Sequence, residues 1–190
     1  MKFAEYRVTY TMMEHAQQTA NKIPDDALKD RNTAGPEMKL AGAMGEMIYF
    51  RWLMDIGVAF FDNRDSTKRD LTTSHGHTID IKTKIRTVKP RPDFEVNFFD
   101  YLKGHQNPDY FGCVQLLRSK SVEGSYSAAY VLGGIDEATV DAVGWHKNKG
   151  DAMKGSGKFY RASCECVNIE HLFSNEKMAK LLLTKKPVTA

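Results

Sequence analysis

The chain has 190 residues, of which 42% are hydrophobic and 27% are charged, and its formal net charge is +3 at pH 7. Length and composition are those of an ordinary soluble globular protein with one domain. No apolar run approaches the roughly 18 residues that a membrane span needs, and the polar N-terminus lacks a signal-peptide core, so we expect a cytoplasmic protein with no membrane partner.

The cysteines Cys113, Cys164 and Cys166 are odd in number and form no C-x-x-C pair. This spacing indicates reduced thiols in a reducing compartment. A zinc site built from Cys164, Cys166 and a histidine is a minor alternative.

Residues 1–35 are polar and weakly patterned, and we interpret them as an N-terminal extension with a short helix over 11–22 and a loop over 25–35. The next stretch, 36–55, predicts a helix with a proline in its first turn and Gly57 just past its end. This helix is apolar nearly all round, so it must be largely buried.

Glu46 is the only charged residue of that helix between Lys39 and Arg51. A carboxylate in apolar surroundings needs a cation or hydrogen-bond donors, because burying it unpaired is costly. Glu46 is therefore a candidate metal ligand, and the alternative is a side chain that reaches an arginine or the solvent.

The stretch after residue 77 alternates strictly, which is the period of a half-buried β-strand. The cluster Ser74-His75-Gly76-His77 before it predicts a turn. If the chain reverses at His75, Asp70 falls opposite Asp80 on the neighbouring strand. Two like charges there destabilise a sheet, but a divalent cation between them turns the cost into a gain. One face would carry Ile79, Ile81, Thr83 and Ile85, and the other Asp80, Lys82 and Lys84.

The remaining pattern completes an α/β fold in which a central mixed β-sheet is flanked by helices, with one domain core over about 36–183. Asp136 is a suitable N-cap for a short helix. We predict strands over 58–61, 94–98, 111–117, 128–135 and 159–167, helices over 136–143 and 175–183, and a basic, glycine-rich loop over 149–158.

Basic residues follow the acid hairpin without an intervening acid, from Lys82 to Pro92. Beside a candidate metal site, this run is best explained as a track for phosphates. A solvated face is the alternative. The residues are Lys82, Lys84, Arg86, Lys89 and Arg91.

Asp70 followed by Asp80-Ile81-Lys82 resembles the active-site signature of the PD-(D/E)XK nuclease superfamily, with Arg69 in place of the proline. The resemblance covers about residues 36–117 and implies a restriction-endonuclease-like fold. It implies that Asp70 and Asp80 hold one or two Mg²⁺ ions, for which Mn²⁺ would substitute. The carbonyl of Ile81 would assist and so, directly or through water, would Glu46.

In such a site the metal lowers the pKa of a bound water, and Lys82 orients that water and stabilises the developing charge. Lys84, Arg86, Lys89 and Arg91 would hold DNA phosphates. The expected function is metal-dependent hydrolysis of DNA, with endonuclease action favoured over exonuclease action. Monomer and homodimer both stay open.

Two other interpretations compete with this one. The first is a non-catalytic, phage-type accessory protein that binds nucleic acid and retains the nuclease fold. The second is a structural protein with a salt-bridged hairpin. His75 and His77 are interpreted as incidental turn residues rather than DNA contacts. The run from Gln106 to Tyr110 is a weak match to a Gln-x-x-x-Tyr element, since Pro108 opposes a helix there.

Overall fold

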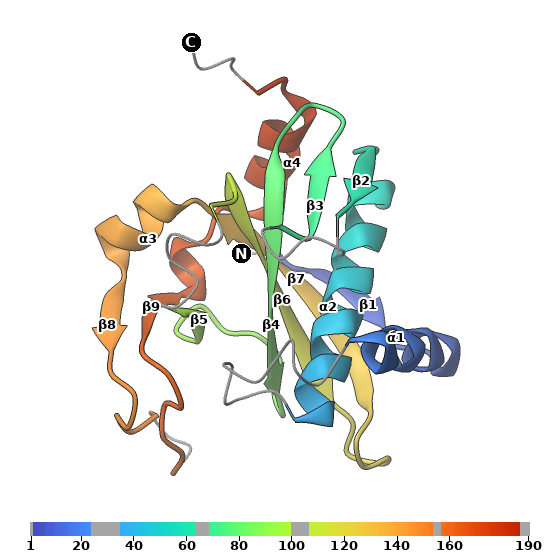
Figure 1. Cartoon of the computed structure of the whole chain (residues 1–190), viewed down its shortest axis with the longest axis vertical. Helices are drawn as coiled ribbons and strands as arrows, with labels where there is room; N and C mark the ends of the chain where they lie inside the picture. Colours follow the sequence, from blue (N-terminus) through green and yellow to red (C-terminus); the bar gives the residue numbers. More distant parts are fainter. Residues whose placement is uncertain (1, 24–34, 64–68, 100–106, 154–156, 187–190) are drawn as a thin grey trace.

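The structure is a computed structural model of the chain and describes residues 2–23, 35–63, 69–99, 107–153 and 157–186 (Figure 1). The described part contains two β-sheets and four α-helices. In chain order the elements are β1 (Ala4–Arg7), α1 (Tyr10–Lys22), α2 (Pro36–Asp55), β2 (Phe60–Asp62), β3 (Leu71–Thr73), β4 (Thr78–Arg86), β5 (Glu95–Phe99), β6 (Tyr110–Arg118), β7 (Tyr126–Ile135), α3 (Glu137–Val143), β8 (Trp145–Lys147), β9 (Cys164–Asn168), a 3₁₀ turn (Ile169–His171) and α4 (Asn175–Leu183).

The larger sheet has six strands in the order β1-β7-β6-β4-β3-β2. Strands β4 and β6 run parallel, whereas the other neighbours are antiparallel. This mixed sheet confirms the predicted α/β class. A parallel pair needs a crossover connection, and the connection between β4 and β6 carries β5. That strand leaves the large sheet and forms a second one, in the order β5-β9-β8, which the sequence did not predict.

Helix α2 covers one face of the large sheet at very close range. A Cβ atom added to Gly45 would lie 1.9 Å from Oγ1 of Thr83 on β4, and one added to Gly112 on β6 would lie 2.6 Å from the Tyr49 ring. The helix approaches the sheet because both positions lack a side chain. Met178 of α4 contacts Gly134 of β7 in the same layer.

The small sheet covers the opposite face of the large one. Figure 1 shows it with α3 to the left of β4, while α1 and α2 lie to the right. Apolar side chains of the two sheets form a second core. The large sheet is therefore buried on both faces along β6 and β7. This second core includes Val96, Phe98, Cys113, Leu132, Ile135 and Val167.

The helix bounds predicted from the sequence agree closely with the structure. Helix α2 has the predicted bounds, and α1 begins one residue before the predicted 11–22. The predicted N-cap at Asp136 is confirmed, because its carboxylate accepts a hydrogen bond of 2.8 Å from the Thr139 N–H. Ser174 caps α4 in the same way, at 3.2 Å from the Lys177 nitrogen.

Three strands were not predicted or begin more than two residues from the predicted position, whereas the bounds of β2, β5, β6 and β7 differ by one or two residues. Strand β9 begins at Cys164 rather than 159, because Tyr160 instead pairs back with the loop through backbone bonds to Gly150 and Asp151. Strand β8 was not predicted. Strand β1 was not predicted either, and it pairs with β7 at the edge of the large sheet, so the N-terminal extension contributes to the sheet.

Candidate functional site

The chain reverses between β3 and β4 as the sequence predicted. The Thr73 N–H donates to the His77 carbonyl at 2.8 Å, and Gly76 takes a positive φ of 89°. Leu71 pairs with Ile79 across the hairpin. Asp70 is the residue before β3, and continuing this register by one residue would bring it opposite Asp80.

Asp70 lies where β3 separates from β4. Its Oδ2 accepts a hydrogen bond of 2.6 Å from the Ile81 N–H, and its own N–H donates to the Ile79 carbonyl at 3.1 Å. In an extended strand the N–H and C=O of one residue point to the same edge. The Ile81 carbonyl therefore faces the same edge of β4 as the Asp70 carboxylate.

Asp80 and Lys82 project from the face of β4 that the small sheet covers. The Lys82 ammonium contacts Oδ2 of Asp80, and their side chains are 17% and 5% exposed. Oδ2 is fully buried and accepts no aligned hydrogen bond from the described residues, so this contact is an ion pair. The ammonium also lies 5.6 Å from the centre of the Phe111 ring.

These oxygens partly fit a hard divalent cation. The Asp70 carboxylate, the buried Oδ2 of Asp80 and the Ile81 carbonyl are ligands of the kind that Mg²⁺ prefers. Within the described residues, however, no group of three or more His, Cys, Asp or Glu side chains could hold a metal ion. A cation here would therefore need the backbone carbonyl and water in addition to the two carboxylates.

Glu46 belongs to the opposite layer of the fold. Its neighbour Gly45 touches Thr83, which alternates with Lys82 and so points to the other face of β4. The Glu46 side chain is half-buried on α2. The structure thus pairs Asp80 with Lys82 and bonds Asp70 to the N–H of Ile81, the residue between them, and it sets Glu46 on the helix that covers the other face of β4.

The predicted phosphate contacts differ in their surroundings. Lys84 lies between the two sheets, and burial, aided by the nearby Arg86 charge, lowers its pKa below the ordinary value. Arg86 donates to the Glu95 carbonyl at 2.8 Å and stacks on Phe94, with its guanidinium carbon 4.3 Å from the ring centre.

Lys89 and Arg91 are the solvent-facing members of the run. Their side chains are 70% and 63% exposed. Arg91 stacks on Phe94 from 4.5 Å and contacts Asp93 at 3.0 Å. These two residues are the ones that can meet a phosphate without rearrangement of the core.

The turn histidines contact the C-terminal segment. His77 shares a hydrogen bond of 2.8 Å with the Thr184 carbonyl, and the Lys186 N–H donates to the His75 carbonyl at 3.1 Å. The His77 contact favours the incidental interpretation of that imidazole, whereas the His75 contact involves only its backbone. Gln106 of the Gln-x-x-x-Tyr match lies outside the described residues, whereas Tyr110 begins β6.

Asp109 anchors this same end of β4 and was not singled out from the sequence. Its Oδ2 accepts hydrogen bonds from the N–H and hydroxyl of Thr78 at 2.8 and 2.9 Å, and its Oδ1 lies 2.5 Å from the Lys186 ammonium. Burial acts to raise the Asp109 pKa, but the bonds from Lys186 and Thr78 outweigh it and hold the pKa below its ordinary value.

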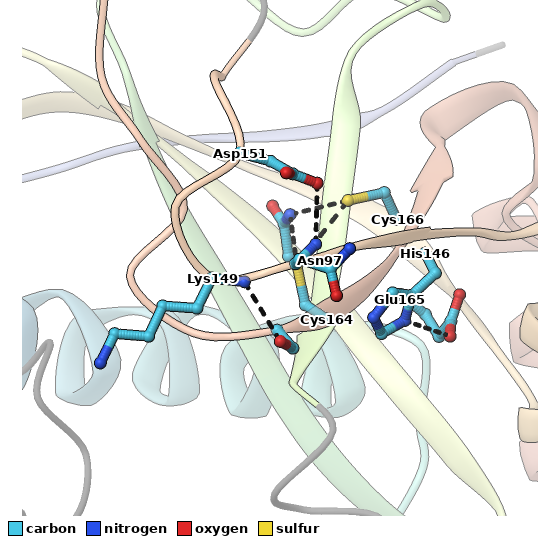
Figure 2. A network of polar contacts seen from close by, with 9 residues as sticks. Asn97, His146, Lys149, Asp151, Cys164, Glu165 and Cys166 are labelled. Atoms are coloured by element: carbon cyan, nitrogen blue, oxygen red, sulfur yellow. Dashed lines mark hydrogen bonds and ion pairs between the residues drawn. The ribbon is translucent and has the colours of Figure 1, made fainter.

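The small sheet brings the candidate thiols Cys164 and Cys166 together with an asparagine, not with the histidine that the zinc alternative required, and this asparagine was not singled out from the sequence. Asn97 of β5 reaches the sulfurs of Cys164 and Cys166 on β9 (Figure 2). The available signal was the C-x-C spacing, which puts both thiols on one face of a strand. To one side, His146 and Glu165 interact through a contact of 3.1 Å.

No protein-family model matches the chain, and no curated protein matches its sequence. Among the residues that the structure describes, no helix is long and apolar enough to cross a membrane.

Proposed function

We propose that the protein is a metal-dependent nuclease of the PD-(D/E)XK type that hydrolyses phosphodiester bonds in DNA, acting as an endonuclease in the cytoplasm. One observation carries the proposal: a buried acid, Asp80, contacts Lys82 on one strand, and the N–H of the residue between them, Ile81, donates to a second acid, Asp70. Burial makes this pair costly to keep for stability alone, since a buried ion pair is often no better than apolar side chains.

Asp70, Asp80 and the Ile81 carbonyl would hold Mg²⁺, which when bound supplies a water of lowered pKa and stabilises charge on the phosphate. Lys82 has two roles in this scheme. Without metal it neutralises Asp80, and with metal its ammonium is released to orient the attacking water and to stabilise negative charge on phosphate oxygens. Lys82 is the more exposed of the pair, at 17% against 5% for Asp80.

Cleavage of circular DNA tests endonuclease action directly. We expect nicking or linearisation with Mg²⁺ or Mn²⁺ and none with EDTA. Lys82→Ala should abolish cleavage, whereas Lys120→Ala, in the loop after β6, should cleave as the wild type does. Lack of turnover on single-stranded, double-stranded and branched DNA with either metal would rule out the enzyme.

Metal binding can be measured without substrate. Mg²⁺ or Mn²⁺ at a hundredfold excess over its dissociation constant should stabilise the wild type by roughly 2.7 kcal/mol. The same metal should stabilise Lys82→Ala at least as much, because the competing ammonium is gone, and should do little for Asp80→Asn. If neither metal changes the melting temperature of the wild type, the assignment of Asp70 and Asp80 as metal ligands is wrong.

A non-catalytic nucleic-acid-binding protein is the second candidate, and the ion pair between Asp80 and Lys82 favours it. In that case both side chains are structural, and the exposed Lys89 and Arg91 bind phosphates. DNA binding should then survive Asp80→Asn, and no metal should support cleavage.

Salt dependence separates the exposed cations from the packed ones. Removal of one cation that binds a phosphate should flatten the slope of log affinity against log salt by roughly 0.9 for double-stranded DNA. We expect this for Lys89→Glu and Arg91→Glu, and not for Lys120→Glu. Unchanged slopes would make Lys89 and Arg91 ordinary solvated surface.

A further inference from the structure

Cys164 and Cys166 form a closely spaced dithiol on the small sheet, where they pack with Tyr160, Trp145 and Met153. They alternate along β9, so both side chains point to one face, and both residues are fully buried. Their sulfur atoms lie 3.8 Å apart. Two metal–sulfur bonds of about 2.3 Å that meet at roughly 110–120° separate their sulfurs by about 3.8–4.0 Å. The thiols are therefore already spaced as two ligands of one metal ion.

Asn97 supplies a third polar group at the same point. Its side-chain amide contacts the Cys166 sulfur at 3.1 Å and the Cys164 sulfur at 3.4 Å (Figure 2). The residue is 8% exposed, and its Oδ1 has no hydrogen-bond partner among the described residues. Rotation of the amide by 180° exchanges its oxygen and nitrogen, which would aim this unpaired oxygen at the two sulfurs.

One cation lies near the two thiols, and a chain of hydrogen bonds leads from Cys166 to an acid. Lys84 of β4 lies close enough to interact electrostatically with both thiols. The Cys166 thiol donates to the Tyr160 hydroxyl at 3.6 Å, which in turn donates to the Glu95 carboxylate at 2.7 Å. A proton that leaves Cys166 therefore has a hydrogen-bonded route to a half-buried acid.

We propose that Cys164 and Cys166 bind one Cu⁺ ion as thiolates, with the amide oxygen of Asn97 as a third donor. Soft thiolates select Cu⁺ and Zn²⁺, but zinc in structural sites takes four protein ligands, and among the residues that the structure describes the two thiols and Asn97 supply three. Each thiol loses one proton as its bond to copper forms, and no electron is transferred. The bound ion and two thiolates carry a net charge of −1, which Lys84 offsets. The site shares no residue with the proposed catalytic set of Asp70, Ile81, Asp80 and Lys82.

The probe is Cu⁺ itself, held at a defined free concentration by a chromogenic chelator in anaerobic buffer. The full-length reduced protein should take one equivalent from the chelator. Cys164→Ser and Cys166→Ser should lose this binding, whereas Cys113→Ser, which removes an equally buried thiol on β6, should keep it. Copper uptake that survives both substitutions at 164 and 166 would overturn the proposal.

Two further variants distinguish a built site from any loose pair of thiols. Asn97→Ala and Lys84→Met keep both sulfurs, and we expect each to weaken Cu⁺ binding by roughly 10–100-fold, the usual cost of removing a group that supports the ligands. Affinities equal to the wild type in both variants would refute this site.

A measurement on the wild type alone removes any dependence on how the variants fold. X-ray absorption at the copper edge should show two sulfur neighbours, and calorimetry in two buffers should show release of one proton per thiol. A copper environment without sulfur, or displacement of Cu⁺ by equal free Zn²⁺, would contradict the proposal.

Discussion

The two faces of β4 show how differently one strand can be used. On one face Thr83 meets the bare backbone of Gly45 on α2, and its neighbours are aliphatic. On the other, Asp80 and Lys82 form an ion pair, and Lys84 approaches two thiols. Both faces are covered, the first by a helix and the second by the small sheet.

This difference separates packing from chemistry. The aliphatic face stabilises the fold through close contact, and any residue of the right shape would serve. The charged face places ionised groups in a poorly solvated layer, where each charge needs a partner. A row of such groups along one strand points to binding or catalysis, and the following variants test this contrast.

The largest effect should come from breaking the ion pair on the charged face. Lys82→Met leaves Asp80 buried without its counter-ion, which typically costs about 3–5 kcal/mol. Urea denaturation in EDTA at pH 7 would measure this loss. The double variant Lys82→Met with Asp80→Asn should recover most of it, and a single variant as stable as the wild type would mean that the pair is not buried in solution.

On the aliphatic face, Gly45→Ala should lower the free energy of unfolding by about 1–3 kcal/mol, since the new Cβ would overlap Thr83. Gly42→Ala is the matched control in the same helix, because a Cβ there meets nothing within 4 Å. Gly42→Ala should raise the free energy of unfolding by about 0.5–1 kcal/mol, because alanine has the higher helix propensity. Thermal melts of the two proteins should therefore move in opposite directions, and shifts of the same sign would contradict this packing.

Lys84→Met should raise the stability of the metal-free protein at pH 7 modestly. Burial lowers the pKa of Lys84 in the folded state. Its charge therefore costs stability below that folded pKa, and the cost disappears as the pH rises towards the unfolded value. Chemical denaturation at pH 7 and pH 10 should show a larger gain at pH 7. A destabilised variant would indicate that Lys84 has a partner that stabilises its charge.

The smallest effect concerns acid. The folded pKa of Asp109 lies below the unfolded one, so its carboxylate contributes stability above about pH 4, and this is lost as the pH falls through the folded value. Asp109→Asn should flatten the decline in melting temperature below pH 4. Lys186→Met should weaken the same decline. If melting temperature falls below pH 4 as steeply in both variants as in the wild type, this ion pair does not stabilise the folded state.

The sequence predicted those features whose cause is local. The bounds of α2 follow from Pro36, Gly57 and an unbroken apolar stretch, and the Asp136 cap follows from one side chain and the next turn. The turn at His75 and the alternation along β4 are equally local, and together they place Asp80 and Lys82 on one face. The mixed sheet followed from adding such segments.

The partners of the charged face came from elsewhere in the chain. Asn97 meets Cys164 and Cys166 across separations of 67 and 69 residues. Period-two alternation predicted one polar face for β4 and left open what covers it. Strand β5 departs into a second sheet because its backbone pairs with β9, which lies far from it along the chain.

Glu46 illustrates the same division. Its burial among small and apolar residues was readable from the helical period, which repeats every 3.6 residues. The sequence did not show which face of the sheet the helix covers. That depends on where Gly45 and Gly112 let the helix backbone approach the strands. Residue patterns thus determined the elements and the faces of each, whereas long-range packing decided which faces meet, because contacts between distant segments form only as the whole chain closes.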